Sequence, residues 1–328
     1  AAHLLFFMNW IILLLNRIYH TPLLLSIYRV VKCIVRLSTG TTELYRLCNA
    51  TIITQQQLEN EGTDEKLDVQ DIRVPSNIIY RIDQSIYYSK QLQQEKYQLG
   101  ITDCSVESIL ERIVYKKAFP STRVPAAYVL KYSLIQIYQS NQVLSTVEQH
   151  VRTRYDPDNK AHEAQLLLLW SKMKPDTPVE RKSKQWVEIG FQGSDPATDF
   201  RGMGIQGLND LVYFVEHYPT HAHSVLQHAS HPTYWYPYAI VGINITKFAY
   251  QLLESKQLQS YLYQYGTTLD IFQEFYCYLF YHFNQFWISH EPKPTVMDFE
   301  AKFIEFKAHI TKDLMQKKVM PFASFIHN

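Results

Sequence analysis

The residues best suited to chemistry lie in the segment WVEIGFQGSDPATDFRGMGIQG (residues 186–207), which holds five of the chain's ten glycines. Within it, Arg201 stands between Phe200 and Gly202, so a long, permanently charged side chain leaves a backbone whose neighbours add little bulk. The glycines prevent a regular helix before Gly204, after which apolar residues recur with helical spacing. The pattern predicts a structured loop that leads into a helix and presents a guanidinium to a partner.

Two other interpretations of this loop are a dinucleotide-binding site and a purely structural role. Gly202, Gly204 and Gly207 match the G-x-G-x-x-G spacing of dinucleotide sites. No β-run precedes them, however, and no acid lies near residues 222–227 to hold a ribose, so the fingerprint fails on context.

A purely structural role for Arg201 stays open. In that interpretation Asp195 or Asp199 locks the guanidinium, which only pins the loop. Gln192 would then cap backbone groups in the turn, whereas in a catalytic interpretation it is a candidate for positioning water. The acids would orient the loop or Arg201 in either case.

The remaining histidine, cysteine and nucleophile motifs give no clear sign of a metal or catalytic site. Five histidines fall within fifteen residues, but Pro219 and Pro232 interrupt the helix that would align them, and no carboxylate or cysteine joins them at ligand spacing. These are His217, His221, His223, His228 and His231. The four cysteines lie far apart, and no nucleophile turn of the G-x-S-x-G kind occurs. We therefore expect no metal site and no independent hydrolase, while Asn244, inside an apolar helical run, marks either a partner surface or a buried amide bonded to backbone.

The elements that position this loop are predicted to be helices. Glycine makes up roughly 3% of the 328 residues, which disfavours folds that turn tightly every ten residues. Apolar residues, 46% of the chain, recur at spacings of three and four in sets such as Ile79, Ile82 and Ile86. Thr267 and Asp270 have the spacing of a capping box before an aromatic stripe that we interpret as core. The fold class is therefore all-α, and a formal net charge of +1 argues against nucleic acid as a partner.

We expect three regions along the chain, at 1–49, 50–77 and 78–328. Leu4 to Leu15 is too short an apolar run to span a membrane alone, and the next stretch, Leu23 to Leu37, gathers its polar residues on one helical face. Residues 4–37 are thus predicted to associate with a membrane surface, with basic residues at the lipid headgroups. The alternative is that they dock on the domain as core. The basic residues are Arg17, Arg29, Lys32, Arg36 and Arg46. Residues 50–77 read as an acidic linker, and the start is open between residue 1 and Met8.

The run from Trp186 to Gly204 resembles the signature of the ELMO domain, and so do the flanking stretches at 166–186 and 238–246. The resemblance covers about residues 100–315, and TELYRLC (42–48) is similar to the short ELMO-domain-containing proteins. It implies a single all-helical ELMO domain.

The same resemblance implies a function. Proteins of this group are GTPase-activating proteins for Arf and Arf-like small GTPases, and the arginine of the D-F-R-G-M-G run, here Arg201, is taken to be catalytic. Asp195, Asp199, Gln192, Gly202 and Gly204 would support it. No cofactor is implied, because GTP and Mg²⁺ belong to the partner, and the chain would be an activator rather than an enzyme with its own active site. The alternatives are a non-catalytic scaffold that binds a GTPase or exchange factor, and a membrane tether. Family members are associated with mitochondria, endoplasmic reticulum, Golgi and lipid droplets, on the cytoplasmic face, and with the cytosol.

Overall fold

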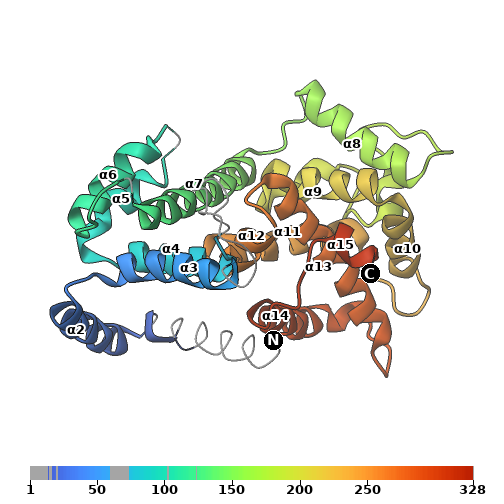
Figure 1. Ribbon diagram of the computed structural model, residues 1–328. Helices are drawn as coiled ribbons and strands as arrows, with labels where there is room; N and C mark the ends of the chain where they lie inside the picture. Colours follow the sequence, from blue (N-terminus) through green and yellow to red (C-terminus); the bar gives the residue numbers. More distant parts are fainter. Residues whose placement is uncertain are drawn as a thin grey trace. The chain divides into compact units, whose positions relative to one another are not determined.

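The computed structural model describes Leu14 and residues 17–19, 21–59, 74–101, 103–122 and 124–327, with the backbone alone for 52–59. All the regular elements in these residues are helices (Figure 1), which confirms the predicted all-α fold. The chain forms two compact units: unit 1 runs to Gln142 and includes Leu262–Thr267, and unit 2 comprises Val143–Tyr261 and Thr268 onward. The expected single body from residue 78 is thus divided within α7 (Pro125–Arg152), whose uninterrupted helical pattern offers no boundary signal.

Unit 1 is built around α4 (Ser76–Tyr87), α5 (Gln93–Gln98) and α6 (Val106–Lys116). Their apolar residues at spacings of three and four are buried in one core together with the first half of α7, as the periodicity predicts. Tyr263, from α12 (Gln259–Tyr265), joins this core and donates a hydrogen bond to the buried carboxylate of Asp83 at 2.8 Å. Unit 1 therefore uses a segment distant in the sequence to complete its interior.

The region expected as a linker is partly helical. The helix α3 (Glu43–Glu59) runs ten residues into it, and α4 begins at Ser76. Residues 60–73 lie outside the described residues. The stretch TQQQLE at 54–59 has neither glycine nor proline, and glutamine, leucine and glutamate are good helix formers, so polarity alone did not end the helix.

The helix α2 (Pro22–Thr39) begins at a proline, and of the basic residues predicted to lie at lipid headgroups Arg36 is exposed, whereas Arg29 and Lys32 are half-buried and bind other residues of the protein. Arg29 donates to the carbonyl oxygen of Tyr88 at 3.0 Å, and the Lys32 ammonium lies 2.5 Å from the Glu43 carboxylate. These acceptors are distant in the sequence or on the next helix, so the helical spacing of the basic residues could not reveal them. The aliphatic side chains are exposed instead, and no residue of α2 is buried, so the alternative of ordinary core does not describe this helix either.

Of the predicted membrane-associating residues 4–37, the first ten lie outside the described residues. Within the part of the chain that the structure describes, no helix combines the length and hydropathy needed to cross a bilayer.

Unit 2 is centred on α9 (Gly204–His217), in which ten of fourteen residues are buried. Around it pack α8 (Lys160–Met173), α10 (Pro219–Ala229), α11 (Tyr238–Glu254) and α13 (Leu269–Ser289). The aromatic stripe of α13 is buried, which confirms its interpretation as core. The predicted cap was wrong by one residue, because Thr268 accepts the hydrogen bond from the Ile271 N–H while Thr267 bonds to Gln139.

Two further helices complete unit 2. The helix α14 (Phe299–Met315) packs on α13 through Phe303 and Phe306, whose rings lie 5.8 Å and 5.4 Å from that of Phe283. The short helix α15 (Phe322–Ile326) also packs on α13. Its first turn is held by Glu274, whose carboxylate accepts a hydrogen bond from the Ala323 N–H at 2.7 Å.

Candidate functional site

The glycine-rich segment is an irregular loop with two short 3₁₀ turns, η3 (Lys184–Ile189) and η4 (Pro196–Gly202). The regular helix α9 starts at Gly204, as the sequence predicts. The 3₁₀ turns place Arg201 in the last turn of η4, three residues before the first residue of that helix. Arg201 therefore stands at the end of an ordered turn in unit 2.

A row of packed aromatic rings supports the loop. Trp170 packs edge-on against Trp186 at 5.2 Å between ring centroids, and Trp186 meets Phe191 at 5.6 Å. Phe191 in turn meets Phe200 at 5.7 Å, and Phe200 stacks on Tyr155 at 5.6 Å. Since Phe200 is 1% exposed, its buried ring fixes the backbone from which Arg201 projects.

One end of the loop is held against α11 at Gly190. This glycine has a φ of +83°, and a Cβ there would lie 2.2 Å from the backbone nitrogen of Tyr238. The Ile240 N–H donates to the Gly190 carbonyl oxygen at 3.3 Å. Only glycine permits this approach, because any side chain would collide with backbone atoms.

The other end is held against the residues that follow α7. Gly204 has a φ of +53°, and a Cβ there would lie 2.4 Å from the carbonyl oxygen of Thr153. The same oxygen accepts a hydrogen bond from the Ile205 N–H at 2.8 Å. The first turn of α9 is thus seated directly on backbone, and the loop is fixed at both ends.

Asp195 and Asp199 bind backbone and basic groups of the loop and of the residues just before it. Asp195 accepts hydrogen bonds from the Ala197 N–H at 3.2 Å and the Arg181 guanidinium at 3.0 Å, and its second oxygen lies 3.3 Å from the Lys182 ammonium. Partial burial opposes the charge of Asp195, but these partners together lower its pKa. Asp199 accepts from the Gln192 N–H at 2.9 Å, and its burial raises its pKa despite that bond.

Arg201 is exposed and has no hydrogen bond or ion pair with any residue that the structure describes. Its charge acts on Asp199 only at longer range, as a minor influence that lowers the carboxyl pKa. The purely structural interpretation required Arg201 to pair with Asp195 or Asp199, and neither pair is present. Gly202 is exposed too, and a Cβ there would meet nothing within 4 Å.

Gln192 also differs from the capping role considered for it. Its side chain is exposed, and the hydrogen bond in the turn comes from its backbone N–H to Asp199 rather than from its amide. The side chain is thus exposed on the same loop as Arg201. Gly207 lies buried in the first turns of α9, where a Cβ would be in ordinary contact with Phe200 and Ile243.

A buried polar chain behind the loop was missed by sequence reasoning. The His150 ring nitrogen lies 2.9 Å from the Gln206 amide oxygen, and the Gln206 amide donates to Asp210 at 2.7 Å. The Thr246 hydroxyl donates to the other oxygen of Asp210 at 2.9 Å. Burial raises the pKa of Asp210 to about 7. The available signal was a pair of polar residues, four apart, on the apolar face of α9.

The histidines after α9 serve separate structural contacts. The His223 ring bonds to the Lys172 carbonyl oxygen at 2.8 Å, His228 lies 2.9 Å from the Asn284 amide nitrogen, and His231 stacks on Tyr234. Among the residues that are described, no three histidines, cysteines or acids come together as a metal site would require.

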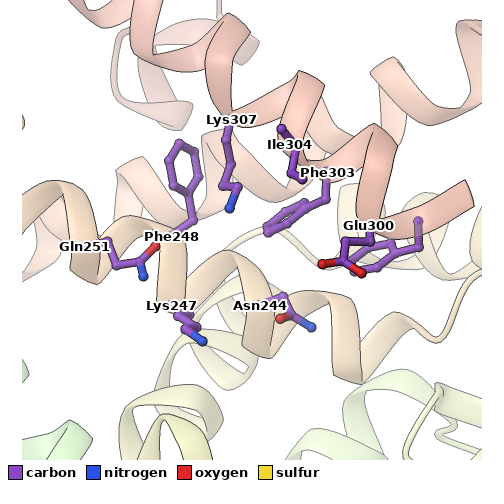
Figure 2. Close-up of a pocket in the computed structure, with 9 residues that line it drawn as sticks. Asn244, Lys247, Phe248, Gln251, Glu300, Phe303, Ile304 and Lys307 are labelled. Atoms are coloured by element: carbon purple, nitrogen blue, oxygen red, sulfur yellow. The ribbon is translucent and has the colours of Figure 1, made fainter.

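Asn244 is half-buried on α11 and donates to the Ile240 carbonyl oxygen at 2.9 Å. The backbone bond expected in one interpretation is present, although the amide is half-buried rather than buried, and the other interpretation, a partner surface, stays a prediction. Its side chain nevertheless also lines a surface groove between α11 and α14 (Figure 2).

Comparisons with known proteins agree with this architecture. The model of the ELMO/CED-12 family matches residues 145–303, which include the whole loop and α9. ELMO domain-containing protein 2 of Homo sapiens is 40% identical over 237 residues, which cover 71% of this chain and 80% of that protein. ELMO domain-containing protein 1 of Homo sapiens is 35% identical over 318 residues, 88% of each chain, and ELMO domain-containing protein B of Dictyostelium discoideum is 32% identical over 297 residues, 88% of this chain and 96% of that one. No solved structure matches the chain significantly. With these relatives aligned along most of its length, the chain belongs to the ELMO/CED-12 family.

Proposed function

We propose that this protein accelerates GTP hydrolysis by an Arf or Arf-like small GTPase, and that Arg201 supplies the decisive charge in trans. The observation that carries the proposal is an exposed arginine, free of hydrogen bonds and ion pairs among the described residues, on a loop fixed at Gly190 and Gly204. A charged side chain whose backbone is held while its guanidinium is unused suits insertion into another protein's site.

The chemistry requires such a group. During GTP hydrolysis, negative charge spreads over the phosphoryl oxygens, and a guanidinium inserted from a second protein neutralises it and excludes water. An arginine so placed contributes about 10³ to 10⁵ in rate, or about 4 to 7 kcal/mol of barrier. Lysine cannot reproduce the planar fork that bridges two oxygens. The nucleotide and its Mg²⁺ would belong to the GTPase, so this chain needs no cofactor and no active site of its own.

Three residues would position the arginine without touching the nucleotide. Asp195 and Asp199 hold the loop through its own backbone, and Gly204 seats the following helix. Gln192 is the candidate for positioning water, because its side chain is exposed on the same loop. A maximal rate left unchanged by Gln192→Ala would remove it from the chemistry.

The test is single-turnover hydrolysis of GTP by a panel of Arf and Arf-like GTPases, with catalytic amounts of the full chain. We expect acceleration by several orders of magnitude for one or more members, and its loss in Arg201→Lys. Arg154→Lys is the matched control, because Arg154 is also an exposed arginine of unit 2 without hydrogen bonds or ion pairs to described residues. Unfolding curves establish that both variants are folded.

Binding without acceleration would favour the scaffold instead. In that case a GTP-loaded GTPase would bind the chain equally in wild type and in Arg201→Lys, and neither protein would change the hydrolysis rate. Loss of activity in Arg154→Lys as well would point to the charge of this surface rather than to one catalytic group.

A second function, attachment to a lipid surface, is favoured by α2. Seven aliphatic residues of this helix are 36–82% exposed, among them Leu23, Ile27, Ile34 and Leu37, while Arg29 and Lys32 bind the Tyr88 carbonyl and the Glu43 carboxylate. An exposed aliphatic face is what inserts at the boundary between headgroups and acyl chains. The chain would then act at the cytoplasmic face of an intracellular membrane.

Flotation with phosphatidylcholine vesicles tests this second function. We expect the full chain to float with the vesicles and Ile27→Glu/Ile34→Glu to remain in solution. Tyr97→Glu/Tyr115→Glu is the control, because it changes two exposed apolar residues of unit 1 outside α2. Equal flotation of all three proteins would exclude α2 as the attachment.

A further inference from the structure

The loop that carries Arg201 is connected to the surface of α11 by a short series of hydrogen bonds. Asp199 accepts from the Gln192 N–H at 2.9 Å, and two residues earlier the Gly190 carbonyl accepts from the Ile240 N–H at 3.3 Å. The Ile240 carbonyl accepts from the Asn244 amide at 2.9 Å. Since one helical turn rises about 5.4 Å, Asn244 lies one turn along α11 from the residue bonded to the loop.

A groove of about 400 Å³ begins at Asn244 and runs between α11 and α14. Figure 2 shows Asn244, Lys247 and Gln251 along α11, with Lys307 reaching toward them from α14. Aromatic rings form its floor and an exposed isoleucine its wall: Phe248, Phe299, Phe303 and Ile304. The volume is at the low end of the range of ligand pockets, roughly 300–1,000 Å³, so it suits one or two side chains of a partner.

The two lysine ammonium groups of the groove form no ion pair with the described residues. Lys247 is exposed and has no hydrogen bond or ion pair with the described residues, and Lys307 places its ammonium 5.2 Å from the centre of the Phe303 ring. Glu300 is the one acid of the lining and stands toward one end in Figure 2. Two ammonium groups above an apolar floor match a hydrophobic side chain with a carboxylate beside it.

We propose that this groove is a second docking site for the GTP-bound GTPase, taking an apolar side chain and a neighbouring carboxylate from the surface of that partner. The inference rests on the proposed function and extends it from the catalytic arginine to recognition. A stable protein interface covers roughly 800 Å² on each partner, much more than one loop presents. The loop bonds to α11 at Ile240, one turn before Asn244, and the proposal places the rest of the GTPase interface on the exposed side of α11 that begins there.

The experiment measures initial rates of hydrolysis at increasing concentrations of GTP-loaded GTPase, with catalytic full chain. For Lys247→Glu/Lys307→Glu we expect KM to rise about tenfold or more while kcat stays within about twofold of wild type, because removed attraction weakens the encounter but leaves Arg201 in place. The difference should shrink as salt is added. Lys160→Glu is the control, since Lys160 is an exposed lysine on α8 in unit 2. Arg201→Lys should show the opposite pattern, with kcat lost.

These outcomes separate the two ideas. A double variant with wild-type KM, in a system where Arg201→Lys abolishes kcat, overturns the docking site and leaves the proposed function standing. If the wild type binds a GTPase without accelerating it, the proposed function fails, and weaker binding of the double variant than of Lys160→Glu still supports the groove. Neither binding nor acceleration across the panel overturns both.

Discussion

Asp199 accepts a hydrogen bond from the backbone N–H of Gln192 at 2.9 Å and makes no ion pair with Arg201, two residues away. The Asp199 carboxylate therefore bonds to the backbone elsewhere in the loop and does not pair with the Arg201 guanidinium. The same holds for Asp195, whose charged partners are Arg181 and Lys182. Asp195 and Asp199 both hold the loop. Arg201, which lies between the buried Phe200 and the start of α9, is therefore left without an acidic partner among the described residues.

Removing the Asp199 carboxylate should weaken activation more than it weakens the fold. We expect Asp199→Ala to lower kcat about tenfold or more and the free energy of unfolding by about 1 kcal/mol, the usual contribution of one hydrogen bond. Asp199→Asn keeps an acceptor for the Gln192 N–H and should retain most of the rate. Rates with GTP-loaded GTPase and urea unfolding check this, and equal rates for Asp199→Ala and wild type would contradict it.

Two glycines that flank Met203 should respond oppositely to the same change. Gly204→Ala would place a methyl group 2.4 Å from the Thr153 carbonyl oxygen at a φ of +53°, so we expect a loss of at least about 2 kcal/mol in unfolding free energy. Gly202→Ala meets nothing within 4 Å and should be nearly neutral. Urea denaturation of both variants is the measurement, and similar stabilities would mean that the seating of α9 is looser than described.

Two buried groups should give stability opposite dependences on pH. Burial raises the pKa of Asp210 to about 7 from an ordinary 3.8, so the folded protein holds a proton that the unfolded chain releases, and this contribution to stability is lost as pH rises from about 4 to 7. Burial lowers the pKa of His282 to about 4 from 6.5, so its contribution is present above 6.5 and is lost as pH falls toward 4.

Single substitutions should therefore expose one slope at a time. In Asp210→Asn the contribution of His282 remains without that of Asp210, so the unfolding free energy should fall on acidification from pH 6.5 to 4.5 more steeply than in wild type. In His282→Phe the contribution of Asp210 remains without that of His282, so the unfolding free energy should fall less over that range than it does in wild type. Urea unfolding at several pH values checks both. Parallel pH profiles for the two variants would be incompatible with this assignment.

Glu274 should act as the attachment of the C-terminal helix. Its carboxylate accepts from the Ala323 N–H at 2.7 Å and from the hydroxyls of Tyr213 and Tyr218, and the side chain is 7% exposed. We expect Glu274→Ala to cost about 2 to 3 kcal/mol, because several buried donors lose their acceptor. Amide exchange in α15 should accelerate, whereas Glu305→Ala, at an exposed acid of α14, should leave it unchanged. Unaltered protection of α15 in Glu274→Ala would show that Phe322 alone secures it.

The amino-acid sequence by itself predicted the helical class and the character of the site. Helices follow from the spacing of apolar residues, which is a local property, and the loop follows from five glycines gathered in one segment. The start of α9 at Gly204 could be predicted for the same reason, because the conformational freedom of the backbone depends on each residue type. The length of α3 was misjudged where polarity was taken for the end of a helix.

The tertiary structure alone decided which groups meet. Whether Arg201 is paired depends on where Gln192, Arg181 and Lys182 come to lie. The contact of Gly204 with Thr153 joins residues 51 positions apart, and Arg29 of α2 finds its acceptor at Tyr88. Hydrogen bonds and ion pairs form over a few ångströms between residues that the sequence separates widely, so their partners are set by packing rather than by spacing.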